Sequence, residues 1–226
     1  MASPPGCATR VSNVAFVKAE VQLGPVTRKG KELDDAAMVA ARAFHNDPFF
    51  EYLDPMGVTR ARGLSLFWRA TIAGAGTQAV VTGATDKDGR LMGLSVVIPP
   101  GAYPLPATGQ ARQLAGAFRA MVIRPTALVK GTRYLFAIEK AHPKERLWYL
   151  LLLVTDPSMQ RSGIGTLLQQ DMLAQADADG LDCYLETQKP ENVPYYRRFG
   201  YEVDKELKPV PGGPTIYTMR RKPAST

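Results

Sequence analysis

The sequence predicts an α/β fold, a single domain built on a mixed β-sheet with helices on both faces. Three observations predict it. Apolar runs of strand length alternate with helix-length amphipathic segments along most of the chain. Residues 77–82 and 91–98 flank Asp88-Gly89, a turn signal that makes this pair an antiparallel hairpin. Residues 147–154 and 181–187 enclose one helix, and such a βαβ unit is right-handed with parallel strands.

The first half of the chain begins with a tail, residues 1–13, whose small residues and prolines predict disorder. We expect the domain to occupy residues 14–226, because no linker divides them. The elements expected next are a strand at 14–23, helices at 33–44 and 56–73, the hairpin, and helices at 110–122 and 126–141. Phe49, Phe50 and Tyr52 follow the Asp47-Pro48 helix stop and are predicted to lie in a loop.

The second half opens with the apolar run 147–154, which is too short to span a membrane and fits one buried strand. Later elements are a helix at 163–178, a strand at 181–187, a short helix at 191–199, and strands at 201–208 and 215–220. The long helix places Leu167, Leu168, Met172 and Leu173 on one face.

The composition is that of a soluble globular protein, with 45% hydrophobic and 22% charged residues. No run approaches the length of a bilayer span and no secretory signal is visible, so we expect a cytoplasmic protein that is not bound to a membrane. The net charge of +7 would suit nucleic acid or an anionic cofactor. The basic residues are scattered and no nucleic-acid motif accompanies them, so a solvated basic surface is expected rather than a nucleic-acid-binding one.

Cys7 and Cys183 are the only cysteines, and we predict that both are free thiols. Two histidines and two cysteines without ligand spacing do not make a metal site, so no metal is expected. His142 precedes Pro143 at a helix end, where a capping or packing role is expected.

A polar turn links the strand 147–154 to the helix that follows. It reads Gln160-Arg161-Ser162-Gly163-Ile164-Gly165-Thr166. The first amides of a helix have no intrahelical partner and attract anions, and glycines remove the Cβ atoms that would hold a phosphate away. No lysine follows Gly165, and Leu168 stands where a third glycine would be needed, so neither a P-loop nor a Rossmann fingerprint is present.

The pattern Gln160-x-x-Gly163-x-Gly165 resembles the pyrophosphate-binding motif of the GNAT-type N-acetyltransferases. The segment 185–201 resembles a second signature of that family, in which an Asn, here Asn192, opens a short helix that carries a Tyr and ends at Gly-Phe or Gly-Tyr. Its Leu-Glu-Thr opening and Asn-x-Pro-x-Tyr-x-Arg core look more narrowly like the puromycin N-acetyltransferase branch. The resemblance implies a GNAT-like sheet, acetyl-CoA as the cosubstrate, and a CoA-binding half at about 147–220.

The resemblance also implies roles for individual residues. Residues Gln160, Arg161, Ser162, Gly163, Ile164, Gly165 and Thr166 would hold the pyrophosphate, mainly through backbone amides. Leu153 and Val154 would pair through their backbone with the pantetheine amides, like an added strand. For Asn192 two roles stay open, a bond to the pantetheine or a cap on its own helix.

Acetyl transfer to an amine needs a base for the ammonium and an acid for the leaving thiolate. Tyr196 occupies the position of the signature tyrosine and is the candidate acid; a packing role is its alternative. Tyr195 should face another direction and is given a packing role. Glu186, at the end of its strand, is the candidate base, since burial would raise its pKa toward a useful value. A water relay and an ordinary ion-paired glutamate are the alternatives.

The predicted function is therefore direct transfer of acetyl from acetyl-CoA to a primary amine of a small molecule in a ternary complex. Phe49, Phe50 and Tyr52 either line an acceptor pocket or anchor the first helices. The alternatives are acetylation of a protein N-terminus or lysine, and a non-catalytic CoA-binding module. Nucleic acid is an unlikely partner, and the sequence leaves open whether the protein is a monomer or a homodimer.

Overall fold

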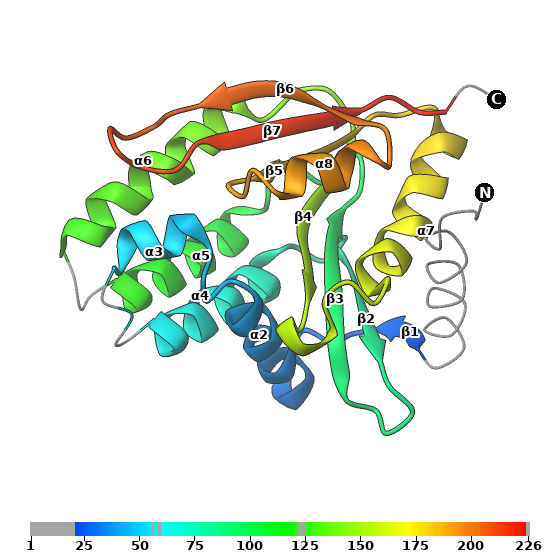
Figure 1. Cartoon of the computed structure of the whole chain (residues 1–226), viewed down its shortest axis with the longest axis horizontal. Coiled ribbons are helices and arrows are strands. Elements are labelled where there is room, and N and C mark those ends of the chain that lie inside the picture. Colours follow the sequence, from blue (N-terminus) through cyan, green and yellow to red (C-terminus); the bar gives the residue numbers. More distant parts are fainter. Residues whose placement is uncertain (1–20, 56, 58–59, 122–124, 225–226) are drawn as a thin grey trace, which may run out of the picture.

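A seven-stranded mixed sheet forms the centre of the protein (Figure 1). The computed structural model describes residues 21–55, 57, 60–121 and 125–224. The strands lie in the order β1-β2-β3-β4-β5-β7-β6. Only β4 and β5 pair in parallel, and the other five pairs are antiparallel. The predicted fold class, a mixed α/β sheet with helices on both faces, is therefore confirmed.

The strands have the following bounds: β1 Gln22–Pro25, β2 Val80–Thr85, β3 Leu91–Ile98, β4 Trp148–Thr155, β5 Cys183–Thr187, β6 Tyr201–Leu207 and β7 Ile216–Arg221. The helices are α2 Gly30–Ala43, α3 Pro48–Leu53, α4 Arg60–Gly74, α5 Ala107–Met121, α6 Pro125–Ala141, α7 Ile164–Asp179 and α8 Asn192–Arg197. A 3-10 turn, η1 Pro157–Met159, lies between β4 and α7. None of the helices in the described ranges is long and apolar enough to cross a membrane.

Two predictions in the first half of the chain were wrong in detail. The segment after Asp47 was predicted to be a loop but forms α3, because the Asp47 carboxylate caps it by accepting the Phe49 N–H at 3.0 Å and Pro48 fits the first turn. The strand predicted at 77–82 lies at Val80–Thr85, directly before the hairpin turn. The tail at 1–13 and most of the strand predicted at 14–23 lie outside the described residues.

The two faces of the sheet are covered by different helices. Buried residues of α2 and α4 pack with Tyr149, Leu152 and Tyr184 on one face. Buried residues of α7 and α8 pack with Trp148, Leu150 and Leu185 on the other. Figure 1 shows α2 and α4 on one side of β3 and β4, and α7 on the opposite side. Successive side chains of a strand point to opposite faces, so β4 and β5 each contribute to both clusters.

Strands β4 and β5 part soon after they meet. Their parallel register comprises only Trp148 with Cys183 and Tyr149 with Tyr184. In the β3–β4 pairing, Val96 pairs with Leu152 and Val97 with Leu150, so Leu151 is an extra residue in β4. Such a bulge bends its strand. The remainder of β4 therefore has backbone groups directed toward β5 that β5 does not pair.

Candidate active site

The glycine turn between β4 and α7 exposes a run of backbone amides. Arg161 has φ +65° and Gly163, the N-cap of α7, has φ +97°. The first amides with a backbone acceptor are those of Thr166 and Leu167, both bonded to the Gly163 carbonyl. Consecutive N–H groups around left-handed residues form an anion-binding concavity, and the dipole of α7 adds positive potential there. Arg161 is a non-glycine residue in the left-handed region, and backbone strain of this kind concentrates at functional sites.

Asp156 fixes this turn, and sequence analysis did not identify it. Its buried carboxylate accepts hydrogen bonds from the Ser158 N–H and hydroxyl at 3.1 and 2.7 Å and pairs with Arg42 of α2 at 2.7 Å. Burial alone would raise the pKa of Asp156, but the bonds from Ser158 and Arg42 outweigh it and hold the pKa below its ordinary value. The Ser162 hydroxyl closes the turn by donating to the Met159 carbonyl at 2.6 Å.

Leu153 and Val154 lie on the part of β4 that has left β5. Both pair on their other side with β3, opposite Ser95 and Leu94. The Val154 side chain is buried in the cluster with α2 and α4, and Leu153 is half-buried. The β5-facing backbone of this part of β4 is thus available to a ligand that adds like a strand.

Tyr195 of α8 packs against the start of α7. The Tyr195 hydroxyl accepts from Gln169 of α7 at 3.1 Å. A Cβ on Gly165 would stand 2.8 Å from the same hydroxyl. Gly165 was expected to leave room for a phosphate. That expectation was wrong for the side on which a Cβ would lie, because the Tyr195 hydroxyl occupies that space. Tyr195 therefore has a packing role, as expected, against α7.

Tyr196 is buried, with 8% of its surface exposed, among Leu150, Leu185 and Tyr201. Burial raises the pKa of Tyr196 above its ordinary value, so the phenol keeps its proton at neutral pH. Within the described residues its hydroxyl makes no hydrogen bond. A protonated phenol that is not engaged by the protein is suited to donate to a ligand.

The Asn192 side chain joins α8 to the end of β5. Its amide donates to the Thr187 hydroxyl at 2.9 Å, and the N-cap of α8 is Glu191, which makes no side-chain cap. The capping role proposed for Asn192 is therefore not what its side chain does. The bond anchors the short helix that carries both tyrosines.

Glu186 lies in a buried cluster on the face opposite Tyr196. Its side chain is 7% exposed, and its Oε2 accepts the Tyr149 hydroxyl at 2.9 Å. The His142 Nδ1 lies 3.7 Å from Oε1. Burial, followed by the negative charge of Glu186, raises the pKa of Tyr149 and of Tyr184 well above ordinary values. Both phenols therefore stay neutral beside the carboxylate.

His142 has the packing role expected from sequence, but its neighbour was not expected. Its ring is stacked on Tyr103, with centroids 3.7 Å apart, and its side chain is only 4% exposed. No sequence signal joins the end of α6 to β5. The single available hint was the rarity of histidine, which occurs twice in the chain.

The aromatic residues of α3 serve as core anchors. Phe49 packs on Tyr134 of α6 with ring centroids 4.8 Å apart, and Phe50 packs edge-on against Phe67 of α4 at 5.5 Å. The Lys130 ammonium lies 4.1 Å from the Tyr52 ring centroid. The anchoring alternative for these rings is the one that the structure favours over a pocket lining.

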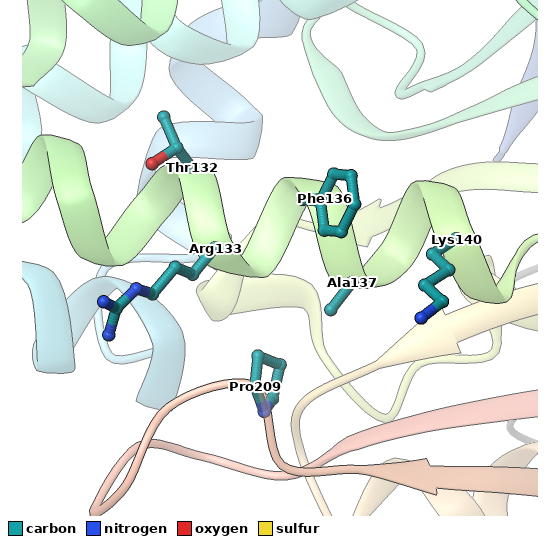
Figure 2. A pocket seen from close by; sticks show the side chains of 6 residues that line it. All are labelled: Thr132, Arg133, Phe136, Ala137, Lys140 and Pro209. Carbon is teal, nitrogen blue, oxygen red and sulfur yellow. The ribbon is translucent and has the colours of Figure 1, made fainter.

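An open groove of about 560 Å³ runs along α6 (Figure 2). The residues that line it are Thr132, Arg133, Phe136, Ala137, Lys140 and Pro209. Phe136 is 71% exposed. None of the residues proposed for the site lines this groove.

The remaining reactive groups give no second centre within the described residues. Cys183 is a free, buried thiol, and burial raises its pKa to about 11. Cys7 lies outside the described residues. Among residues 21–224, apart from the undescribed gaps, no three His, Cys, Asp or Glu side chains are grouped to hold a metal ion.

Comparisons with known proteins bear on the family and the fold. The model of the acetyltransferase (GNAT) family matches residues 109–201, which include the glycine turn, β5 and α8. A Corynebacterium glutamicum protein, described as histone acetyltransferase HPA2 and related acetyltransferase, shares the fold with a TM-score of 0.63 and 19% identity. The alignment covers 92% of this chain and 98% of that one.

Two further structures share the fold. Arylalkylamine N-acetyltransferase 2 from Aedes aegypti has a TM-score of 0.54 and 11% identity, over 89% of this chain and 98% of that one. PaiA N-acetyltransferase from Thermoplasma acidophilum, solved in complex with coenzyme A, has a TM-score of 0.52 and 13% identity over the same shares. The glycine turn, β5 and α8 thus lie inside the match to the GNAT acetyltransferase family, and the chain shares the fold of solved acetyltransferases over nine-tenths of its length.

Proposed function

We propose that the protein transfers acetyl directly from acetyl-CoA to a primary amine of a small molecule. One observation carries the proposal. The parted strands β4 and β5 have the amide-lined turn at their open end and present Glu186 on one face and Tyr196 on the other. An acyl thioester placed between the strands would meet a base from one side and an acid from the other.

The cosubstrate would be held by three sets of groups. Residues 160–166 supply backbone amides for the pyrophosphate, and Arg161 adds a charge. The unpaired backbone of Leu153 and Val154 serves the pantetheine amides. Asn192 keeps its side-chain oxygen for a pantetheine N–H, because its amide nitrogen is already engaged by Thr187. The unpaired backbone of β4 fits an extended amide chain, and the amides of the glycine turn fit a diphosphate.

The chemistry assigns one proton transfer to each side chain. Glu186 takes a proton from the acceptor ammonium, which frees the nitrogen lone pair for attack on the thioester carbon. The C–N bond forms, the C–S bond breaks, and Tyr196 donates its proton to the departing thiolate. Tyr196 is reprotonated by the nitrogen, which loses its second proton as it becomes an amide. The net products are the N-acetyl compound, CoA thiol and one proton.

The experiment that tests the function is a thiol-release assay with acetyl-CoA and a panel of amines. The panel contains arylalkylamines, aminoacyl nucleosides, free amino-terminal peptides and lysine peptides. We expect turnover with a small amine to exceed that with the peptides. Turnover restricted to peptides would replace the small-molecule acceptor by a protein, and CoA binding without turnover on any amine would identify a binding module.

The finer features belong to the same proposal. The Asn192 to Arg197 segment supports a place near the puromycin N-acetyltransferase branch, so the aminoacyl nucleosides are its direct test. We further propose one domain at 14–226, with the CoA-binding half at about 147–220, in the cytoplasm. Size-exclusion chromatography with light scattering would decide between a monomer and a homodimer.

A further inference from the structure

Glu186 and His142 each direct a buried atom without a partner toward the other. Among the described residues, Glu186 Oε1 and His142 Nδ1 are both buried without a hydrogen bond, and they lie 3.7 Å apart. Unpaired buried polar atoms are rare because each has lost its hydration. A small rotation of either side chain would close this gap to a hydrogen bond.

The position of the His142 ring is fixed by its surroundings. Its backbone N–H donates to the Ile138 carbonyl at 2.9 Å, at the end of α6. Tyr103 stacks on one side of the ring, and Tyr149 and Tyr184 meet it edge-to-face at 4.7 and 4.9 Å. The ring therefore lies between three aromatic neighbours with Nδ1 near the carboxylate.

The groups that contact this pair do not change charge near neutral pH. Burial is the largest cause that raises the pKa of Tyr103, Tyr149 and Tyr184, and the charge of Glu186 adds to it in each case. Further out, the exposed Glu139 of α6 accepts the Tyr103 hydroxyl, and Asp204 of β6 adds negative charge near Tyr184. The three phenols therefore do not compete with the Glu186–His142 pair for a proton in this range.

We propose that His142 acts on the reaction through the base Glu186, as its positioning residue. It receives the proton that Glu186 takes from the amine. The inference rests on the proposed function. The ammonium N–H bond breaks and an O–H bond forms at Glu186 Oε1; that bond then breaks as an N–H bond forms at His142 Nδ1. Glu186 is again an anion, beside an imidazolium that compensates its charge in the buried site. His142 then releases the proton to solvent before the next turnover.

A measurement that needs no turnover tests the pairing. The chain has two histidines, His45 and His142, so nitrogen–proton spectra of the rings contain two signal sets. In Glu186→Gln we expect the ring signals of His142 to move, because the carboxylate oxygen that lies 3.7 Å from Nδ1 is replaced by a neutral amide. The signals of His45 should not change. Unchanged His142 signals would overturn the proposal.

Steady-state kinetics then separate a relay from simple packing. His142→Phe retains the aromatic stack but cannot titrate. We expect it to lower kcat/KM at least about tenfold in the wild-type background and to shift the acidic limb of the pH profile. In the Glu186→Gln background it should cost nothing more, because the base that it serves is absent. Equal losses in both backgrounds would mean that His142 only supports the fold.

Two controls complete the design. His142→Asn restores a hydrogen-bond donor near Nδ1 without a titrating ring, and it should leave the acidic limb shifted; a restored wild-type limb would contradict the relay. His45→Phe should have the wild-type profile. If the wild-type protein acetylates no amine, the proposed function fails by itself, while the ring spectra still decide whether His142 and Glu186 are coupled.

Discussion

The two faces of the β4–β5 pair differ in chemistry although the same two strands build both. On the α7–α8 face, Trp148, Leu150, Cys183 and Leu185 form a largely apolar cluster with Tyr196 and Tyr201. On the α2–α4 face, Tyr149, Tyr184 and Glu186 meet His142. Strand alternation separates the two sets completely. The α7–α8 face is a packed, largely apolar core, and the α2–α4 face keeps buried polar groups close to where the strands part.

Substitutions of Leu185 and Glu186 test this contrast most strongly, because the two are neighbours whose side chains point to opposite faces. Leu185→Ala should lower the free energy of unfolding by roughly 2–5 kcal/mol, because it opens a cavity at a residue that is 1% exposed. Glu186→Gln should leave stability unchanged or higher, since it removes a buried charge, but should abolish most turnover. Denaturant unfolding and thiol release measure the two effects. Loss of stability in both variants would erase the distinction between the faces.

Substitution of Tyr196 tests whether the α7–α8 face contributes to the chemistry. Tyr196→Phe removes one hydroxyl and should lower kcat about 100-fold while the dissociation constant for CoA changes little, because a general acid acts on the leaving thiolate. Tyr195→Phe is the matched control: it breaks the bond with Gln169 and should affect kcat less. Wild-type kcat in Tyr196→Phe at every pH would move the acid to another residue.

Substitution of Gly163 tests the anion-binding role of the glycine turn between β4 and α7. Gly163→Ala places a Cβ on a residue with φ +97°, which strains the turn and displaces its amides. We expect CoA affinity to fall about tenfold or more, a loss of about 1.4 kcal/mol or more. Gly180→Ala, at the left-handed C-cap of the same helix, applies similar strain far from the amides and should leave affinity unchanged. Calorimetry would contradict the phosphate assignment if both variants bound CoA normally.

Asp156 gives the smallest expected effect. Its pKa is depressed in the folded protein, so its ionised form stabilises the fold above the ordinary aspartate value of 3.8, and that contribution is lost as the pH falls through the lower folded pKa. Asp156→Asn should therefore be less stable at pH 7 by about 1 kcal/mol or less, given the exposure of Arg42. The difference should vanish at acidic pH. A pH-independent difference would mean that the charge plays no part.

The sequence predicted what local patterns encode. The hairpin, the βαβ unit and the apolar stripe of α7 follow from period and turn residues, and their types were confirmed. Helix α3 was missed because Asp47-Pro48 was interpreted as the stop of the preceding helix, although the same pair also starts a helix as an N-cap and a first-turn proline. The Tyr195–Gly165 approach and the His142–Glu186 pair join distant segments. Such contacts depend on how α6, α7 and α8 pack on the sheet, which periodicity does not specify.

Trp148 controls more than its own packing. Its backbone N–H donates to the Asp182 carbonyl at 2.9 Å, and its indole N–H donates to Asp179 at 3.0 Å. Both bonds lie at the end where β4 and β5 are paired, and this parallel pairing is only two residue pairs long. If β5 slipped by one residue, Leu185 would turn toward His142 and the carboxylate would enter the hydrocarbon side. Trp148 thus helps to hold the alignment of Glu186 and Tyr196 through hydrogen bonds that involve neither of their side chains.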